Sequence, residues 1–337
     1  MNSSLRDWAQ LVRVPNTLTS AADVLAGLCL GGGTAYSLLE RPVVAMVASL
    51  ASISLYWGGM VLNDVFDYEE DCKNNRQGPL VRGAIPLDTA RKTGFGLLVL
   101  GWLLACAASE IVLVESRATG SDWRGILATG AVALALIASI IAYDGPAKKT
   151  PLAPMLMGLC RALNMTLGMV IASYGLGNET SGLAGIPVGR WLYPVGLGIY
   201  VMGFTISARR EFLTEQSRPR LWVGWLTMAF GILFLATLIG LVSSPSLDRL
   251  IQAKGESVRW FFPCAMLLLG TPVFRRAWVS IETLRGPDLG RAIGQAIQHI
   301  LLIDALIAVV YAGSWAGLVI ALMVIPTGAL GKMFRTT

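Results

Sequence analysis

The chain has 337 residues, of which 54% are hydrophobic and only 14% are charged. A soluble domain carries about a quarter charged residues, so this composition excludes an ordinary soluble protein. The net charge of +6 follows a membrane-topology pattern, and we expect no nucleic-acid partner. Scattered cysteines and a single histidine, His299, argue against a disulfide framework, a zinc site or histidine-based chemistry.

Apolar segments divide the chain into membrane spans, each of which needs about 20 residues. Backbone exposed to lipid must form its hydrogen bonds internally, so we expect helices, and glycine-rich spans favour close packing. The prediction is therefore an all-α polytopic bundle in one integral-membrane domain, residues 1–337. Nine spans are predicted at 17–39, 42–64, 92–114, 124–144, 151–175, 191–212, 220–243, 258–280 and 290–311, and an apolar run at 315–333 would make a tenth.

The distribution of lysine and arginine predicts the orientation. Most of these residues lie at the N-terminus and around the loops that follow the second, fourth, sixth and eighth spans. Cytoplasmic loops are enriched in such residues, so we expect a multi-pass protein with a cytoplasmic N-terminus. A bacterial inner (plasma) membrane is the simplest location. Lys332 and Arg335 in the tail favour ten spans over nine.

Residues 63–71 read Asn-Asp-Val-Phe-Asp-Tyr-Glu-Glu-Asp and end the second span. On a helix, Asp64, Asp67 and Asp71 fall within roughly 60° of one another. Like charges near lipid are costly and repel each other, and a divalent cation removes that repulsion. We therefore predict a Mg²⁺ site on Asp64, Asp67 and Asp71 with Asn63 beside it. The alternative is a solvated helix end with ordinary surface acids.

Two basic loops follow on the same side of the membrane. Arg76 and Arg82 come after the acidic motif, and Lys148 and Lys149 come after the fourth span. Guanidinium groups bind phosphate through two hydrogen bonds, so these residues are candidate diphosphate ligands. The alternative is that they are only the positive charges that any cytoplasmic loop carries.

The fifth span contains two polar residues, Arg161 and Asn164, which share a helix face. A charged residue at membrane depth normally faces a cavity or a partner, and we expect these two to face a substrate cavity. Structural pairing is the alternative. Asp23 in the first span and Asp304 in the ninth leave the same two alternatives open.

These motifs together resemble the UbiA superfamily of intramembrane prenyltransferases. The resemblance is carried by the NDxxDxxxD pattern at 63–71, the loop containing Gly83, the Tyr143-xxxx-Lys148-Lys149-Thr150 pattern and the opening Arg13-Val-Pro-Asn-Thr. Residues 143–168 further resemble the EboC-like subgroup.

The resemblance implies helices around a central cavity that opens laterally to the lipid bilayer. It implies Mg²⁺-dependent transfer of a prenyl group from an isoprenyl diphosphate to an aromatic or other hydrophobic acceptor. By position, Asp64 and Asp67 would be catalytic as well as metal ligands. Arg76, Arg82, Lys148 and Lys149 would contact the substrate.

The sequence departs from the family pattern at its second Asp-rich motif, which should end the sixth span. Residues 204–216 contain no aspartate, although Glu211 and Glu215 share a helix face. Glu211 is then the candidate catalytic base, and binding of a second metal is in doubt. The alternative function is a non-catalytic UbiA-like membrane protein that binds or transports a lipid-linked or small-molecule ligand.

Overall fold

The computed structural model describes residues 3–32, 40–115, 123–173, 186–208, 213–241 and 244–333. These residues are almost entirely helical, as the sequence predicts. The α-helices are α1 (Ser3–Leu11), α2 (Thr17–Gly32), α3 (Pro42–Lys73), α4 (Leu87–Glu115), α5 (Trp123–Asp144), α6 (Ala153–Ser173), α7 (Leu192–Ala208), α8 (Arg218–Leu241), α9 (Pro245–Lys254), α10 (Ser257–Thr283), α11 (Gly286–Ala312), α12 (Ser314–Leu322) and α13 (Val324–Met333).

Within the described ranges, nine helical segments are long and apolar enough to cross a membrane. They include the α12–α13 pair over Ser314–Gly331, which is the predicted tenth span. The first predicted span corresponds to α2, whose described 16 residues are too short to count among the nine. The predicted all-α polytopic membrane bundle is confirmed.

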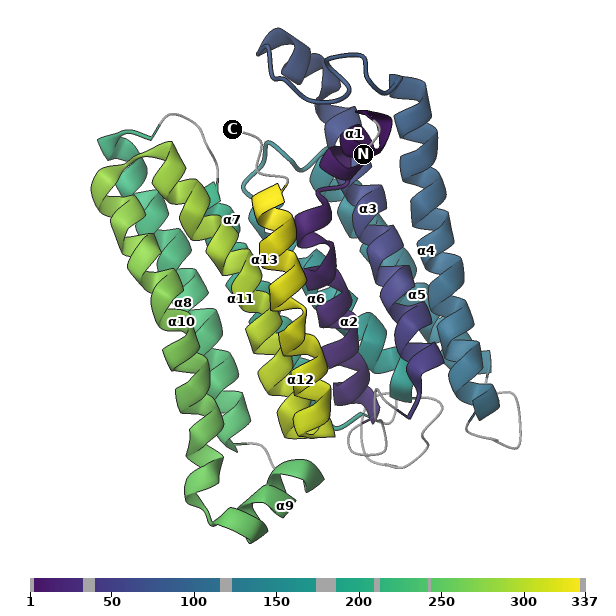
Figure 1. Ribbon diagram of the computed structural model, residues 1–337, viewed down its shortest axis with the longest axis vertical. Coiled ribbons are helices and arrows are strands. Elements are labelled where there is room, and N and C mark those ends of the chain that lie inside the picture. The colour runs from purple at the N-terminus through teal and green to yellow at the C-terminus, as the bar shows by residue number, and fades with distance from the viewer. Residues whose placement is uncertain are drawn as a thin grey trace.

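Helix α2 lies in the middle of the bundle and packs against α3, α6 and α11. Figure 1 shows α3, α4 and α5 on one side of it and the α8–α10 pair on the far side. The end of α3, the N-terminus and the turn between α10 and α11 lie at the same end of the bundle (Figure 1). Polar residues on these segments therefore face the same side of the membrane.

Glycines set the contact between α2 and α6. A Cβ atom on Gly27 would collide with the carbonyl oxygen of Met165, and one on Gly168 would collide with that of Val24. Small residues let transmembrane helices approach to backbone contact, where van der Waals packing holds them together. The polar residues of α2 and α6 can therefore meet inside the bundle.

A second apolar cluster covers the end of α3. Leu11 and Val12, at the end of α1, pack with Val61 and Val65 of α3 and with the segment 80–90. The membrane-span pattern does not predict α1, because its 9 residues are too short to cross a bilayer. The cluster brings the N-terminal segment over the acidic end of α3.

We predict that Gly27→Ala destabilises the protein, because the added methyl group meets backbone that cannot rotate away. Overpacking of this kind costs roughly 1–3 kcal/mol, and the melting temperature in detergent should fall. Gly96→Ala on α4 is the control, since no atom lies within 4 Å of its added Cβ. Equal melting temperatures for the two variants would contradict the close α2–α6 contact.

Candidate active site

The acidic motif lies near the end of the longest helix. Helix α3 has 32 residues and at 1.5 Å per residue is about 48 Å long, against a hydrocarbon core of about 30 Å. Its last turns can therefore leave the apolar layer. Asn63 is buried, whereas the Asp64, Asp67 and Asp71 side chains are 25%, 19% and 18% exposed. These carboxylates are therefore partly exposed, and they are neither fully buried nor fully solvated.

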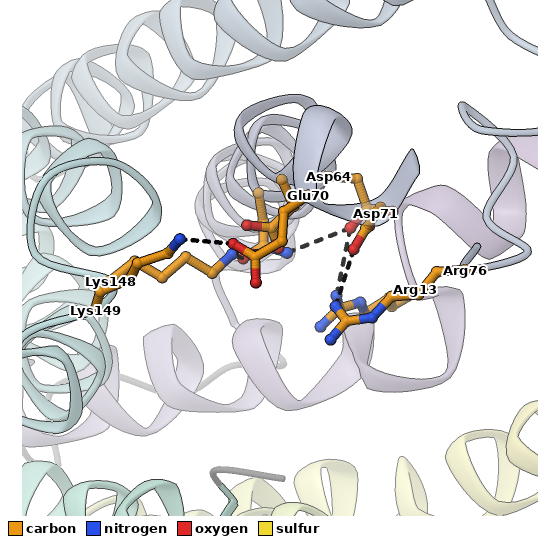
Figure 2. Close-up of polar contacts among 9 residues, drawn as sticks. Arg13, Asp64, Glu70, Asp71, Arg76, Lys148 and Lys149 are labelled. Carbon is orange, nitrogen blue, oxygen red and sulfur yellow. Dashed lines mark hydrogen bonds and ion pairs between the residues drawn. The ribbon is translucent and has the colours of Figure 1, made fainter. Parts of the chain in front are cut away.

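Asp64 is paired with a residue from the N-terminal segment. The Arg13 guanidinium lies 3.5 Å from Asp64 Oδ1, which also accepts a hydrogen bond of 3.3 Å from the Asn63 amide. Arg13 adopts a left-handed backbone conformation, with φ of 51°, at the start of the 3₁₀ turn Val14–Asn16. Figure 2 shows Arg13 on the same side of α3 as Asp71 and Arg76.

The loop between α5 and α6 supplies two more cations. Lys148 Nζ donates to Asn63 Oδ1 at 2.8 Å and forms an ion pair with Asp67. Lys149 lies 2.7 Å from Glu70 (Figure 2). The hydrogen bond to Glu70 and the charge of that carboxylate raise the pKa of Lys149. The structure thus brings both predicted lysines to the acidic motif.

The two predicted arginines of the loop after α3 lie differently. Arg76 forms an ion pair of 2.9 Å with Asp71 and remains at the motif. Arg82 instead lies 3.0 Å from Asp7 of α1 and 3.4 Å from the Gln10 side chain. In this structure Arg82 fastens the loop to the N-terminal helix and does not contact the acidic cluster.

An apolar cavity of about 90 Å³ lies below the motif, between α2, α3, α5 and α6. Gly59 and Met60 of its wall are one helical turn before Asn63. Tyr143 and Asp144 come from the end of α5, just before the lysine loop. The cavity therefore joins an apolar interior to the charged cluster.

Arg161 and Asn164 line this cavity, and they are also paired; their role toward a substrate stays a prediction. Arg161 donates to Asp23 Oδ2 and Thr19 Oγ1, both at 2.8 Å. Asn164 donates to the same Asp23 oxygen at 3.1 Å. Asp23 is fully buried, with Asp304 of α11 beside it. Cavity lining and structural pairing, which the sequence presents as alternatives, both hold.

Asp144, at the end of α5, differs from the paired carboxylates of the cluster. Its Oδ1 is buried and accepts no hydrogen bond within the part of the chain that the structure describes. The charges of Lys148, Arg13, Asp67 and Asp64 all act on it. Five carboxyl groups, Asp64, Asp67, Glu70, Asp71 and Asp144, therefore lie with four paired cations, Arg13, Arg76, Lys148 and Lys149.

No three His, Cys, Asp or Glu side chains converge as a ready-made metal site within the described ranges. The oxygens of Asp64, Asp67 and Asp71 are instead each turned toward a cationic side chain. The donor chemistry still suits Mg²⁺, which prefers carboxylates and keeps several waters. A metal would need these ion pairs to open.

The candidate base Glu211 lies outside the described residues, as do Arg209 and Arg210. Glu215, its predicted neighbour on the helix face, begins a 3₁₀ turn and lies 2.7 Å from Arg218 Nε. The role of Glu211 stays a prediction.

In the sequence, Arg13 is marked only by the family resemblance, and Asp144 carries no predicted role. The spacing between Arg13 and Asp64 gives no signal that they meet, since 51 residues separate them. The Tyr143-Asp144 pair at the end of an apolar span was the available signal for the second residue. Both residues belong to the cluster in the structure.

No family model matches the chain. A 110-residue stretch is 34% identical to digeranylgeranylglyceryl phosphate synthase from Ignicoccus hospitalis and covers 33% of this chain and 34% of that protein. The chain spans between about a third and a half of the length of the first curated relatives it matches.

Solved structures extend the likeness over most of the chain. The apo structure of a UbiA homolog from Aeropyrum pernix K1 matches with a TM-score of 0.59 and 18% identity, covering 91% of this chain and 98% of that one. A UbiA homolog from Archaeoglobus fulgidus bound to DMAPP and Mg²⁺ matches with a TM-score of 0.54 and 13% identity, covering 87% and 99%.

This chain has the fold of the UbiA superfamily. The helical fold that the resemblance in the sequence motifs implies is thereby confirmed, and the narrower likeness to EboC stays a prediction. The UbiA-like bundle places the NDxxDxxxD helix, α3, against the lysine loop and above the cavity.

We predict that Arg161→Leu destabilises the protein by roughly 3–5 kcal/mol, because Asp23 would keep a buried charge without its partner. Thermal unfolding in detergent measures the loss. The double variant Asp23→Leu, Arg161→Leu removes both charges and should recover much of it. An unchanged melting temperature in the single variant would show that Arg161 has no structural role.

Proposed function

We propose that this chain transfers an isoprenyl group from a prenyl diphosphate to a hydrophobic acceptor within the membrane, with Mg²⁺ as cofactor. The observation that carries the proposal is the position of the acidic end of α3, which faces Lys148 and Arg13 directly above an apolar cavity. A prenyl diphosphate has the matching shape, with a highly charged head and an apolar tail.

The charge balance of the cluster supports a bound cation. Within the described residues, Asp144 keeps a buried oxygen without a partner, and three further carboxylates are paired with long, flexible arginine and lysine side chains. Asp64, Asp67 and Asp71, with Asn63 beside them, would hold Mg²⁺. When bound, the ion would neutralise negative charge on the diphosphate as it leaves.

The arginine and lysine side chains of the cluster would then release their carboxylate partners and bind the phosphate oxygens of the substrate. Lys148, Lys149 and Arg76 already reach the motif, and Arg13 approaches it from the N-terminal segment. Charge-assisted hydrogen bonds to phosphate oxygens are strong and directional. Arg82, now paired with Asp7, would join them only if the loop after α3 moved.

The cavity would hold the prenyl chain. Its walls are mostly apolar, with Tyr56 and Tyr143 near the charged end and Arg161 and Asn164 on α6. Cleavage of the allylic C–O bond sends the electron pair to the departing diphosphate and leaves positive charge on the allyl group. Because the apolar walls exclude water, the allylic cation reacts with the acceptor and not with water. The acceptor forms a bond to the allylic carbon and loses a proton.

We also propose the domain organisation, the orientation in the membrane and the catalytic base. Residues 1–337 would form one UbiA-like domain, with the acidic end of α3 and the N-terminus on the cytoplasmic side. A bacterial plasma membrane is the location that the charge pattern suggests most simply. Glu211 is proposed as the base that takes the acceptor's proton.

We predict that Asp64→Ala or Asp67→Ala abolishes Mg²⁺-dependent binding of dimethylallyl or geranyl diphosphate. Loss of an outer-shell partner of a metal costs roughly 10–100-fold in affinity, and loss of a ligand should cost more. Titration calorimetry on the purified protein, with and without Mg²⁺, gives the affinities.

The matched control is Glu69→Ala, which removes an exposed carboxylate that neighbours the motif but lies on another helix face. It should leave the affinity unchanged. Wild-type affinity in the Asp64 or Asp67 variant would contradict the metal assignment.

We predict that Glu211→Gln lowers turnover more than it lowers diphosphate affinity. The amide keeps the size of the side chain but cannot accept the acceptor's proton. Steady-state transfer rates and calorimetric affinities separate the two effects. Turnover equal to that of the wild type would remove Glu211 from the mechanism.

One observation favours the second candidate function, a UbiA-like protein that binds or transports its ligand without transfer. Residues 204–216 lack the aspartates of the family's second motif. Incubation of the protein with Mg²⁺, prenyl diphosphates and a broad acceptor panel distinguishes the two. Tight binding without pyrophosphate release would favour the second function, whereas pyrophosphate and a prenylated product would establish transfer.

A further inference from the structure

A basic groove lies between α10 and α11, away from the cavity described above. It has a volume of about 540 Å³ and is lined in part by Thr271, Arg275, Arg276, Arg291 and Gln295. None of these residues belongs to a motif of the proposed transferase site. Helix α10 packs on α8 and α11 at the edge of the bundle (Figure 1).

The groove carries an excess of positive charge. Its one acidic residue, Asp288, lies 3.4 Å from Arg291 and accepts a hydrogen bond of 2.9 Å from Thr283. Among the residues that the structure describes, Arg275 and Arg276 form no ion pair. Three arginines and one carboxylate give the lining of the groove a net excess of two positive charges.

Such charges are unusual inside an apolar span. Arg275 lies 8 residues before Thr283, or about 12 Å along α10. Charged residues within transmembrane segments normally meet a partner or a water-filled pathway and mark function. Here both arginines are exposed at the surface of the bundle, so the partner has to come from outside the described chain.

The surroundings indicate the membrane interface. Trp278, which follows the arginines on α10, is 52% exposed and packs edge-on against Trp222 of α8, with 5.5 Å between ring centroids. Leu268, about three helical turns before Trp278, is 68% exposed, as expected of a lipid-facing side chain. Tryptophan gathers at the level of lipid headgroups, and apolar residues lie below it.

The groove also offers a polar group to a ligand. Gln295 Oε1 is enclosed and accepts no hydrogen bond within the described residues. A headgroup with both a phosphate and a hydroxyl would satisfy the arginines and this oxygen together. Arginine binds phosphate oxygens through paired hydrogen bonds, and basic pockets between transmembrane helices suit anionic headgroups.

We propose that the groove formed by Arg275, Arg276, Arg291 and Gln295 binds the headgroup of an anionic phospholipid. The lipid comes from the leaflet on the same side as the acidic end of α3 (Figure 1). Its phosphate lies on the arginines, and its acyl chains run along the exposed apolar surface of α10. The site is independent of the proposed transfer reaction.

Native mass spectrometry of the full-length protein in detergent tests the proposal, with phosphatidylglycerol and phosphatidylcholine of the same chain length as probes. The wild type should bind one phosphatidylglycerol at least about tenfold more tightly than phosphatidylcholine, because two uncompensated arginines face the phosphate. The triple variant Arg275→Gln, Arg276→Gln, Arg291→Gln should lose this preference.

The matched control Arg91→Gln, Lys92→Gln, Arg259→Gln removes the same charge elsewhere and should keep the preference. The lysine variant Arg275→Lys, Arg276→Lys, Arg291→Lys preserves the charge and should keep a weaker preference, which guards against a folding defect. An undiminished preference in the triple glutamine variant would overturn the proposal, and so would an equal loss in the control. Displacement of the lipid by millimolar inorganic phosphate would assign the groove to soluble phosphate instead.

Discussion

The acidic end of α3 depends on ion pairs, because each of its three aspartates faces a cation from outside the helix. Arg13, Arg76 and Lys148 come from three parts of the chain, and each is paired with one aspartate of the motif. Without these partners the like charges would repel each other at the edge of the apolar layer. The positions of the N-terminal segment and of the two basic loops therefore depend on this charge pairing.

The helical bundle also encloses an apolar cavity next to the charged cluster. Backbone contact between α2 and α6 through Gly27 and Gly168 holds Asp23 against Arg161 and so fixes the lower wall of the cavity. A charged cluster next to an apolar cavity is the arrangement that suits a substrate with a charged head and an apolar chain. Because α2 and α6 are in close contact, Arg161 and Asn164 can line the cavity and also donate hydrogen bonds to the buried Asp23.

Local pattern was enough to predict the membrane-spanning helices, the acidic motif at the end of α3 and the position of Lys148 and Lys149 at the same end of the bundle. Hydropathy marks membrane spans directly, and the motif's helical spacing fixes its face. The meeting of Arg13 with Asp64 could not be predicted, because it depends on the 3₁₀ turn and on packing of α1 over α3. The pairing of Arg82 with Asp7 has the same origin. Glu211 lies outside the described residues, so its role stays a prediction.

We infer that the cations of the cluster exchange their carboxylates for a diphosphate when Mg²⁺ binds. A structure with Mg²⁺ and a non-hydrolysable prenyl thiodiphosphate would show this exchange. We expect metal on Asp64 and Asp67, phosphate oxygens on Lys148 and Arg13, and the prenyl chain in the cavity beside Tyr143. A headgroup bound elsewhere, with the Arg13–Asp64 and Lys148–Asp67 pairs intact, would contradict it.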